Sequence, residues 1–433
     1  MSERISRPSR TNSASEAVVE LHVEKPTAGG RMLARHNGQI VLVWGAIPGE
    51  RVRARIERSG KGVLFAETVE VVAPSPDRRP GRTDWRCGGN VLAHVAYERQ
   101  LQIKSDIIRD AFARIGRLPL QSSPVVIASP EAGYRMRARL HVGSHRVGFM
   151  REGSHEVCAV GPTQQLLPAT VAWVEGVEAR LREGALKGMT SIEVAENITA
   201  TERAAHLELE PGTDARAFAS LATDAITGLS AQVLDRRGVV TIAGVSTVSD
   251  SIGSLALKRD VRAFFQGNRF LLETLVRHVN NLVPEHGPVV DLYAGVGLFG
   301  LSLAAAGRSD ITLVEGDPIG AHDLEENARP FAERARVDRS SVEDFLRRHT
   351  VASTATVIVD PPRTGMSREA VQSILGVKPA RVLYVSCDVA TLARDVRALV
   401  DDGYGLEQIS AFDLFPNTAH VESVCVLGRE VDD

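Results

Sequence analysis

The C-terminal part of the chain alternates short apolar runs with helical stretches, and this pattern constrains the fold more than any other feature. Four of the runs lie at residues 289–293, 311–314, 356–359 and 381–386. Their length and apolar character are typical of strands that are buried on both faces of a parallel sheet. Two further runs, at 406–414 and 421–427, predict an antiparallel pair at one edge. Together they predict a doubly wound α/β fold.

Reactive side chains stand at the ends of these runs. Asp360 and a Pro-Pro-Arg sequence follow the third run, Cys387 follows the fourth, and Glu422 lies at the start of the last. Open α/β sheets bind ligands outside the carboxyl ends of their strands, so we expect a site there. A cysteine after a strand is more often a small buried side chain than a nucleophile. The polar neighbours of Cys387, Ser386 and Asp388, favour the nucleophile.

A glycine loop follows the first run. Residues 291–300 read Asp-Leu-Tyr-Ala-Gly-Val-Gly-Leu-Phe-Gly, and Glu315 stands 20 residues after Gly295. This spacing matches a dinucleotide-binding loop, and a tight structural turn would look the same. Asp291 at the end of the strand, and the thiol and carboxylate on later strands, favour S-adenosylmethionine as the ligand.

Length and composition bound the remaining possibilities. A chain of 433 residues is too long for one ordinary core, so two or three domains are expected. The sequence has no long uncharged apolar run, so no membrane span is expected. The first 15 residues lack the apolar segment of a secretory signal. Four widely spaced cysteines without a CxxC pair form a poor disulfide framework, which is typical of a reducing cytoplasm. They are Cys87, Cys158, Cys387 and Cys425.

The front of the chain is basic and β-rich. Residues 1–150 hold 24 Lys and Arg against 14 Asp and Glu, whereas the rest of the chain is acidic. Such a region indicates a polyanion partner, although an arginine-rich solvated surface is the alternative. Short β-type runs separated by Gly turns predict a small barrel of a kind that often binds nucleic acid. The expected strands are 18–23, 39–44, 51–56 and 66–72.

These patterns divide the chain into parts. We expect a disordered arm at 1–15, the barrel at 16–73, a mixed α+β central region at 84–260, and the doubly wound region at 261–433. The central region should hold a helix at 97–115 and β-type runs near 135–142 and 239–245. Arg135, Arg137 and Arg139 would share one face of a strand. They would then grip phosphates, face solvent, or pair with acidic residues.

The chain resembles the RNA uracil-5-methyltransferases over nearly its whole length, and most of all the 23S ribosomal RNA members that carry a TRAM domain. The segments that carry the resemblance are 46–52 (AIPGERV), 134–140 (YRMRARL), 264–268 (FFQGN), 360–365 (DPPRTG), 385–388 (VSCD) and 415–422 (FPNTAHVE). The resemblance implies an N-terminal OB-like TRAM barrel that binds RNA. It also implies a central RNA-recognition domain and a C-terminal Rossmann-like class I domain dependent on S-adenosylmethionine.

The same resemblance assigns roles to individual residues. Cys387 is the expected nucleophile, which adds to C6 of a uracil so that C5 can capture a methyl group, and Glu422 is the expected base. Gln266, Tyr293, Glu315 and Asp360 would position the cofactor. The substrate would be a uridine flipped out of folded RNA, and the resemblance implies ribosomal RNA. We expect the protein to act as a monomer in the cytoplasm, without membrane contact.

One family feature is missing from the sequence. Many members bind an iron–sulfur cluster through four cysteines. Cys87 remains at one of the four positions. Gly81 and Asn90 stand at two others, and no cysteine stands near Thr163, where the fourth is expected, since Cys158 lies five residues earlier. One or two thiols cannot hold such a cluster, so we expect no iron–sulfur cluster and no other metal.

Other functions remain compatible with parts of the pattern. The same mechanism could act on a transfer RNA uridine. An NAD-dependent oxidoreductase would use the glycine loop but gives no role to Cys387 or Glu422. An RNA-binding scaffold with a decayed site is a non-enzymatic alternative. N-methylation at the Asp-Pro-Pro motif is disfavoured, because an aromatic residue usually follows that motif and Arg363 stands there.

Overall fold

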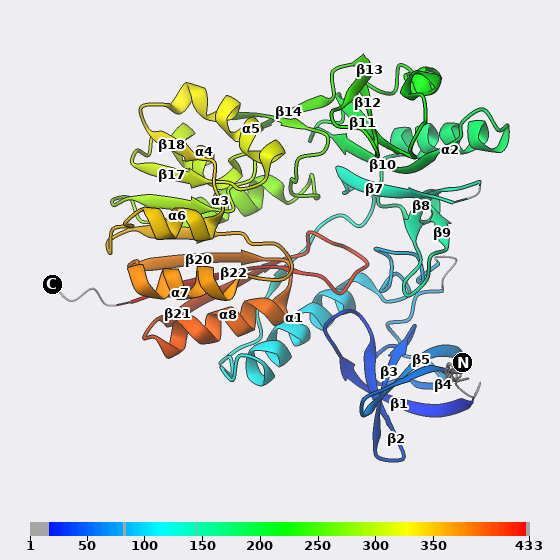
Figure 1. The fold of residues 1–433 in the computed structure, drawn as a ribbon. Coiled ribbons are helices and arrows are strands. Elements are labelled where there is room, and N and C mark those ends of the chain that lie inside the picture. The colour runs from blue at the N-terminus through cyan, green and yellow to red at the C-terminus, as the bar shows by residue number, and fades with distance from the viewer. Residues whose placement is uncertain (1–16, 81–83, 144, 430–433) are drawn as a thin grey trace, which may run out of the picture.

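The computed structural model describes residues 17–80, 84–143 and 145–429, and the chain forms three parts (Figure 1). A barrel comes first, a central sheet follows, and a doubly wound sheet completes the chain. The arm expected at 1–15 and Gly81 lie outside the described residues. Within the described ranges, every helix is too short or too polar to cross a bilayer.

The first part is a closed barrel with the strand order β1-β2-β3-β5-β4. Its strands are β1 (Val18–Pro26), β2 (Met32–His36), β3 (Gln39–Trp44), β4 (Arg51–Gly60) and β5 (Val63–Ala73). Four of them were predicted, and β2 was not. Alternate residues such as Val41, Val43, Val52 and Ala54 are fully buried, as the twofold period of a strand requires.

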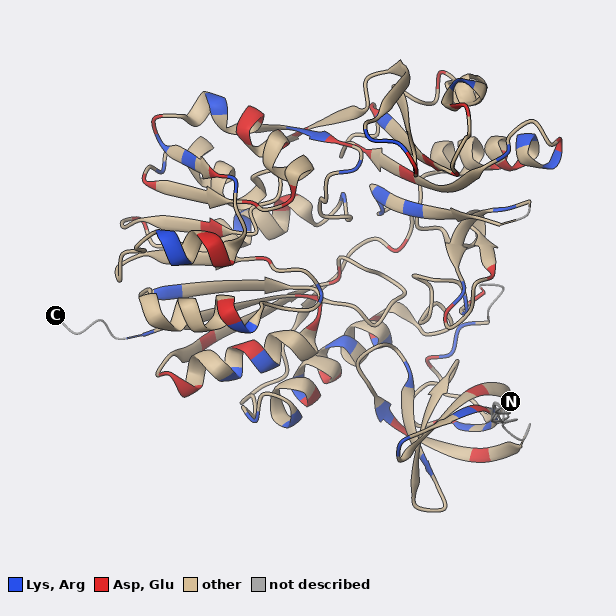
Figure 2. Ribbon diagram, viewed as in Figure 1, with Lys and Arg blue, Asp and Glu red and all other residues tan. Residues whose placement is uncertain are grey.

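Much of the positive charge of the barrel is paired across its strands. The pairs join Arg35 to Glu24 (3.4 Å), Arg51 to Glu20 (3.5 Å) and Arg53 to Glu70 (2.9 Å). Figure 2 shows acidic and basic segments lying together on the barrel. Exposed pairs of this kind contribute at most about 1 kcal/mol each. The net charge of the front end therefore overstates how many cations are free to meet a polyanion.

The central region is a seven-stranded sheet, ordered β13-β12-β11-β10-β7-β8-β9, with its own apolar core. Its elements are β7 (Arg137–Val142), β8 (Val147–Met150), β9 (Val157–Ala159), η1 (Gly161–Thr163), α2 (Pro168–Arg182), β10 (Met189–Glu196), β11 (Arg203–Leu209), η2 (Ala215–Leu221), β12 (Gly228–Val233) and β13 (Val240–Gly244). A hairpin of β14 (Thr247–Ile252) and β15 (Leu255–Asp260) leads into the last part.

Of the alternatives left open for Arg135, Arg137 and Arg139, the structure favours pairing with acidic residues for two of them. Strand β7 begins at Arg137, so Arg135 lies outside it and stacks on the Phe149 ring at 5.4 Å. Arg137 donates to Glu193 (2.7 Å), and Arg139 donates to Glu208 (2.6 Å). These acceptors lie on β10 and β11. The acidic partners already occupy these two guanidinium groups, which is the pairing alternative considered above.

The structure also corrects the interpretation of the cysteines as too dispersed to pair. Cys87 and Cys158, 71 residues apart, form a disulfide. The bond joins the segment after the barrel to β9 of the central sheet. Cys387 and Cys425 are free. Sequence spacing could not show this pair, because two chain segments that are remote in sequence meet only in the fold.

The last part is an eight-stranded sheet in the order β18-β17-β16-β19-β20-β22-β21-β6, with helices on both faces. Its elements from residue 272 onward are α3 (Leu272–Leu282), β16 (Val289–Leu292), α4 (Leu298–Ala305), β17 (Ile311–Val314), α5 (Pro318–Ala328), η3 (Arg329–Phe331), β18 (Ala335–Asp338), α6 (Val342–Arg348), β19 (Thr356–Val359), α7 (Arg368–Val377), β20 (Arg381–Ser386), α8 (Val389–Asp401), β21 (Gly405–Phe412) and β22 (Glu422–Gly428). The predicted antiparallel pair is β21–β22. Strand β18 was not predicted.

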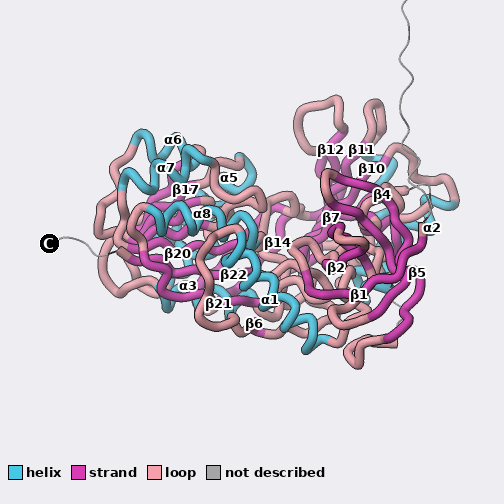
Figure 3. The backbone as a smooth tube through the Cα atoms, turned by 90° about the horizontal axis from the view of Figure 1, so that it is seen from below, coloured by secondary structure: helices cyan, strands magenta, loops and turns pink. Residues whose placement is uncertain are grey.

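The helix expected in the central region belongs to this sheet instead, together with a short strand that was not predicted. Helix α1 (Tyr97–Arg114) packs against α8, and β6 (Val126–Ile127) pairs in parallel with β21. Figure 3 shows α1 and β6 beside β21 and β22, away from the central sheet. Ile103, Ile107 and Phe112 of α1 are buried in the shared core. Residues from before the central sheet therefore help to shape the C-terminal part.

Candidate active site

The sheet topology gathers the predicted site residues along one edge. Strands β17, β16, β19 and β20 are parallel neighbours, so the residues that follow them meet at their carboxyl ends. These residues are Glu315, Tyr293, Asp360 and Cys387. Strand β22 runs antiparallel to β20, with Ser423 opposite Ser386, and this pairing brings its first residue, Glu422, beside Cys387. Gln266 precedes α3 and donates to Asp360 Oδ2 from Nε2 at 3.0 Å.

The glycine loop packs against its own strand and the next one. Gly297 has a φ of 101° and precedes α4. A Cβ atom on Gly300 would lie 2.5 Å from Leu313 Cδ2 and 3.0 Å from Asp291 Oδ2, so only glycine fits. Tyr293, at the end of β16, has a φ of 62°, a left-handed conformation that costs a non-glycine residue roughly 1–3 kcal/mol and clusters at functional sites.

The loop's backbone donors are held by carboxylates. Glu315 accepts from the Gly295 N–H (2.7 Å) and the Asp317 N–H (2.6 Å), and Asp291 accepts from the Gly300 N–H (2.8 Å). Asp291 Oδ1 is buried and has no hydrogen-bond partner among the described residues. A pyrophosphate needs free N–H groups here. Two of the loop's N–H groups are bound by carboxylates, and carboxyl groups so near to the loop suit a cationic ligand better than a pyrophosphate.

The carboxyl groups at this edge hold protons strongly. Burial raises the pKa of Asp360 to about 7, and the hydrogen bond from Gln266 opposes the shift. Burial raises the pKa of Asp291 to about 7 as well. The pKa of Glu422 lies well above its usual range because the side chain is buried and Asp360 is near. Glu422 Oε1 has no hydrogen-bond partner within the described part of the chain. Such a group accepts a proton readily once it is ionised.

Cys387 is half-buried between β20 and α8. Asp388 caps that helix by accepting from the N–H groups of Ala390 (3.1 Å) and Thr391 (2.9 Å). Burial raises the pKa of the Cys387 thiol to about 12, and Glu422 and Asp360 add to the shift. Arg363 opposes it through its charge and a hydrogen bond to the thiol. The resting thiol is therefore protonated, and Arg363 is the group that favours the thiolate.

Neither Arg363 nor His420 was among the predicted site residues, although both lie in segments that carry the resemblance. The loop that carries Arg363 is held by α8, where Thr391 Oγ1 donates to the Arg363 carbonyl (3.3 Å) and Asp395 accepts from the Met366 N–H (3.0 Å). Burial lowers the pKa of His420 to about 4, and Arg363 adds to that shift. His420 is neutral at neutral pH. The Asp-Pro-Pro-Arg sequence was the available signal for Arg363.

No cluster of His, Cys, Asp and Glu suited to a metal ion occurs in the residues that the structure describes. The absence of an iron–sulfur cluster stays a prediction from the missing cysteines.

Comparison with known proteins bears on both the fold and the chemistry. The family model described as tRNA (Uracil-5-)-methyltransferase matches residues 335–430, and the TRAM domain matches residues 16–69. An RNA methyltransferase of Streptomyces coelicolor is 30% identical over 94% of this chain and 92% of its own length. One from Aquifex aeolicus is 29% identical over 96% of this chain and 99% of its own.

The solved structure of the Pyrococcus abyssi tRNA (uracil-54, C5)-methyltransferase in complex with S-adenosyl-L-homocysteine has the same fold. It superimposes with a TM-score of 0.75 and 24% identity, and covers 94% of this chain and 99% of its own. This likeness confirms the expected architecture of a TRAM barrel, a mixed central part and a class I C-terminal domain.

Proposed function

The chain belongs to the RNA methyltransferases, and from its active-site edge we propose that it methylates C5 of a uridine in RNA with S-adenosylmethionine as the methyl donor. Membership of this family removes the NAD-dependent oxidoreductase alternative. The observation that carries the proposal is the convergence of Cys387, Glu422 and Asp360 from three different strands, with Arg363 beside the thiol.

The proposed reaction uses Cys387 as the nucleophile. Its thiolate forms a bond to C6 of the uracil, and the C5–C6 π electrons move toward the O4 carbonyl to give an enolate. Arg363 supports this step because its positive charge lowers the pKa of the thiol. Bound S-adenosylmethionine would supply an electrophilic methyl group to C5, and the bonding pair of the broken S–CH3 bond would stay on sulfur, so that S-adenosylhomocysteine leaves. Methylated C5 then carries both the new methyl group and its original proton.

Glu422 completes the reaction as the base. It takes the C5 proton, the electron pair re-forms the C5–C6 double bond, and the bond between sulfur and C6 breaks to release the thiolate. Burial and the nearby Asp360 raise the pKa of Glu422, which makes its carboxylate a strong proton acceptor. The protein is regenerated with its thiol free and the uridine methylated.

The residues around the glycine loop fit S-adenosylmethionine. Glu315 accepts one N–H at each oxygen, and each oxygen keeps a second lone pair for a ribose hydroxyl. Asp360 and Gln266 would hold the charged end of the cofactor near Cys387, and Tyr293 would border the same pocket. A sulfonium ion is cationic, so the carboxyl groups at this edge attract it.

We propose that the barrel contacts the RNA through a stack of cations and aromatic rings. The Arg31 guanidinium lies 4.6 Å from the centroid of the Trp44 ring and 5.2 Å from that of the Phe65 ring. The Arg58 guanidinium lies 3.5 Å from the centroid of the same Phe65 ring. Such surfaces suit unstacked bases and phosphates. Burial raises the pKa of Glu152, and the positive charges of Arg31 and Arg363 oppose this shift.

The proposed target is ribosomal RNA, because the sequence segments resemble the ribosomal members most of all. The TRAM barrel does not decide between the two RNAs, since the structure of a tRNA methyltransferase covers 94% of this chain. Transfer RNA remains the second candidate, since a tRNA methyltransferase shares the whole fold. We also propose that the protein acts as a monomer.

A direct assay tests this function. Purified protein is incubated with labelled S-adenosylmethionine and RNA from cells that lack the gene, and the nucleosides are separated by mass spectrometry. We expect label in 5-methyluridine with wild-type protein and none with Cys387→Ala. The control variant Cys425→Ala removes the second free thiol, which is buried, and it should retain the activity. Label in another nucleoside would contradict the proposal.

A further inference from the structure

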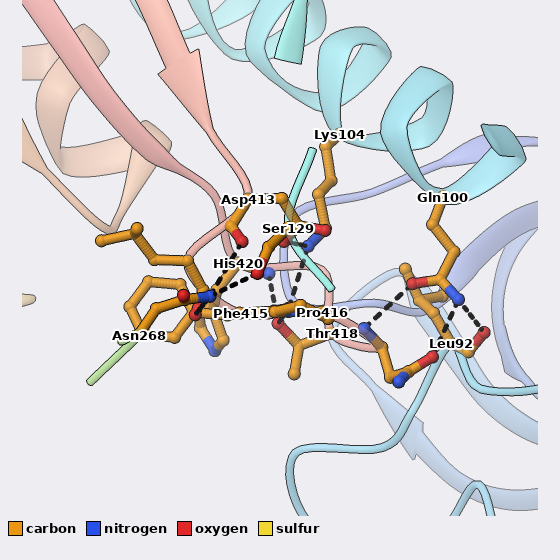
Figure 4. A network of polar contacts seen from close by, with 12 residues as sticks. Leu92, Gln100, Lys104, Ser129, Asn268, Asp413, Phe415, Pro416, Thr418 and His420 are labelled. Atoms are coloured by element: carbon orange, nitrogen blue, oxygen red, sulfur yellow. Dashed lines mark hydrogen bonds and ion pairs between the residues drawn. The ribbon is translucent and has the colours of Figure 1, made fainter. Parts of the chain in front are cut away.

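The loop between β21 and β22, residues 413–421, ends at Glu422 and is anchored by helix α1. Helix α1 begins at Tyr97, so residues more than 300 positions earlier in the chain bind this loop. Figure 4 shows that the contacts come from one face of the helix. None of the helix residues belongs to the sequence motifs that carry the proposed function.

Gln100 is fully buried and forms a two-point contact with Asn417. Its Oε1 accepts from the Asn417 N–H (2.9 Å), and its Nε2 donates to Asn417 Oδ1 (2.9 Å). The same Nε2 group lies within 3.2 Å of the Leu92 carbonyl and 3.0 Å of the Val95 carbonyl. Asn417 has a φ of 64°, so the loop turns sharply at the residue that Gln100 holds.

Lys104 and its neighbours hold the beginning of the loop. The fully buried Lys104 ammonium pairs with Asp413 and donates to the Phe415 carbonyl (2.9 Å). Tyr97 donates from its hydroxyl to Asp413 Oδ2 (2.9 Å). Asn268, two residues after the cofactor-side Gln266, donates to the Leu414 carbonyl (3.2 Å). The loop is therefore fixed at consecutive positions from both sides.

The anchor matters because Glu422 has little else to orient it. Its Oε1 atom has no hydrogen-bond partner in the described part of the chain, so backbone placement sets where this oxygen points. On one side that backbone is β22. On the other side it is the loop, in which Thr418 donates to the Phe415 carbonyl (2.7 Å) and accepts from the His420 N–H (3.1 Å). Asn417 lies five residues before Glu422 along this loop.

We propose that Gln100 and Lys104 are positioning residues for proton abstraction from C5. They hold the loop so that the Glu422 carboxylate faces the substrate beside Cys387, and they do so without touching RNA or cofactor. The inference rests on the proposed function, because Gln100 and Lys104 can position the base only if Glu422 is that base. It predicts a defect in one step of the reaction rather than a general loss of activity.

The test uses Gln100→Leu in the full-length protein. An error of about 1 Å in a catalytic group can cost up to roughly 100-fold in rate, so kcat should fall toward that limit. The KM values should fall together with kcat, so that kcat/KM stays close to wild type, because the altered contact acts only after the covalent complex has formed. Since elimination waits for the base, a covalent protein–RNA complex should accumulate on ordinary uridine-containing RNA.

Two further variants keep the test decisive. Asn417→Gly preserves the backbone N–H and the left-handed turn but removes the side-chain contact, so it should show a smaller defect of the same kind. Ile108→Ala changes a buried residue of the same helix whose side chain forms no hydrogen bond, so it controls for destabilisation. It should lower the melting temperature without trapping the covalent complex.

The outcomes separate this inference from the proposed function. Wild-type protein that makes no 5-methyluridine would refute the function itself. If the wild type is active and folded Gln100→Leu retains full kcat, the inference alone is wrong. It is equally wrong if Gln100→Leu loses activity without accumulating the complex, because the loop would then position some other group.

Discussion

The surroundings of Cys387 predict an unusually inert thiol in the free protein. Two buried carboxyl groups and desolvation raise its pKa to about 12, and Arg363 opposes them. Alkylation by iodoacetamide measures the thiolate directly. Wild type, Glu422→Gln and Arg363→Ala therefore form an informative series. Above the raised pKa of Glu422, where its carboxyl group is ionised, removing that charge should speed alkylation of Cys387, and removing the Arg363 charge should slow it.

The size of the effect follows from the pKa. At about pH 7.5 this thiol is ionised to only about 0.003%, whereas an ordinary cysteine with a pKa of ~8.5 is ionised to about 10%. The more basic thiolate is the better nucleophile, which recovers about 40-fold for a Brønsted coefficient of ~0.45. The net expectation is alkylation about 100-fold slower than for an exposed cysteine.

Mass spectrometry of the peptide that contains Cys387 gives the rate at each pH. Cys425, which is buried in β22, serves as an internal control because it should react only when the protein unfolds. Alkylation of Cys387 within about tenfold of a free thiol would refute the account of this environment. So would a Glu422→Gln variant that reacts more slowly than wild type.

Three more predictions test the pocket and the fold. Gly300→Ala places a Cβ atom 2.5 Å from Leu313, so it should lower the free energy of unfolding by about 1–3 kcal/mol and weaken cofactor binding, which calorimetry measures. The control Gly376→Ala has open space around its Cβ atom and should be neutral or stabilising. The Asp360 carboxyl ionises near its pKa of about 7, so affinity for the cationic cofactor should rise with pH through that value, and Asp360→Asn should flatten the dependence; an unchanged slope would contradict this. Lys104→Met leaves the buried Asp413 without its cation, which should cost about 3–5 kcal/mol and lower the melting temperature by about 6–20 °C; a shift below about 2 °C would contradict the assignment.

The strands that carry the site were predictable because they are buried on both faces. Strands β17, β19 and β20 have the predicted bounds, and β16 ends one residue earlier. Continuous apolar runs record that burial in the sequence. Strand β18 was missed because it reads Ala-Arg-Val-Asp and lies at the edge of the sheet, where half of its surface is solvated.

The order of the sheet and its partners could not be predicted from local patterns. The amphipathic helix α1 was predicted at the correct residues, but an apolar face does not specify which core it covers. The same limit applies to Arg137 and Arg139, whose partners Glu193 and Glu208 come from other strands. The Cys87–Cys158 pair depends on contacts that form only when the central sheet folds.

The site was predictable to the extent that its residues end strands or lie in motifs. Asp360 and Cys387 follow parallel strands, and that rule alone brings them to one edge. Glu422 could be placed beside Cys387 only once the antiparallel register of β20 and β22 was known. Gln100 and Lys104 gave no signal in the sequence, because their function depends on a loop more than 300 residues away.

Transient attachment of Cys387 to the target base is the central claim, and RNA containing 5-fluorouridine tests it most directly. Fluorine at C5 cannot leave as a proton does, so elimination stops after methyl transfer. Wild-type protein with this RNA and S-adenosylmethionine should give a covalent complex that survives denaturing electrophoresis, and digestion should locate the attachment at Cys387. A protein that binds both ligands yet forms no such complex, or forms it equally well as Cys387→Ala, would contradict the account.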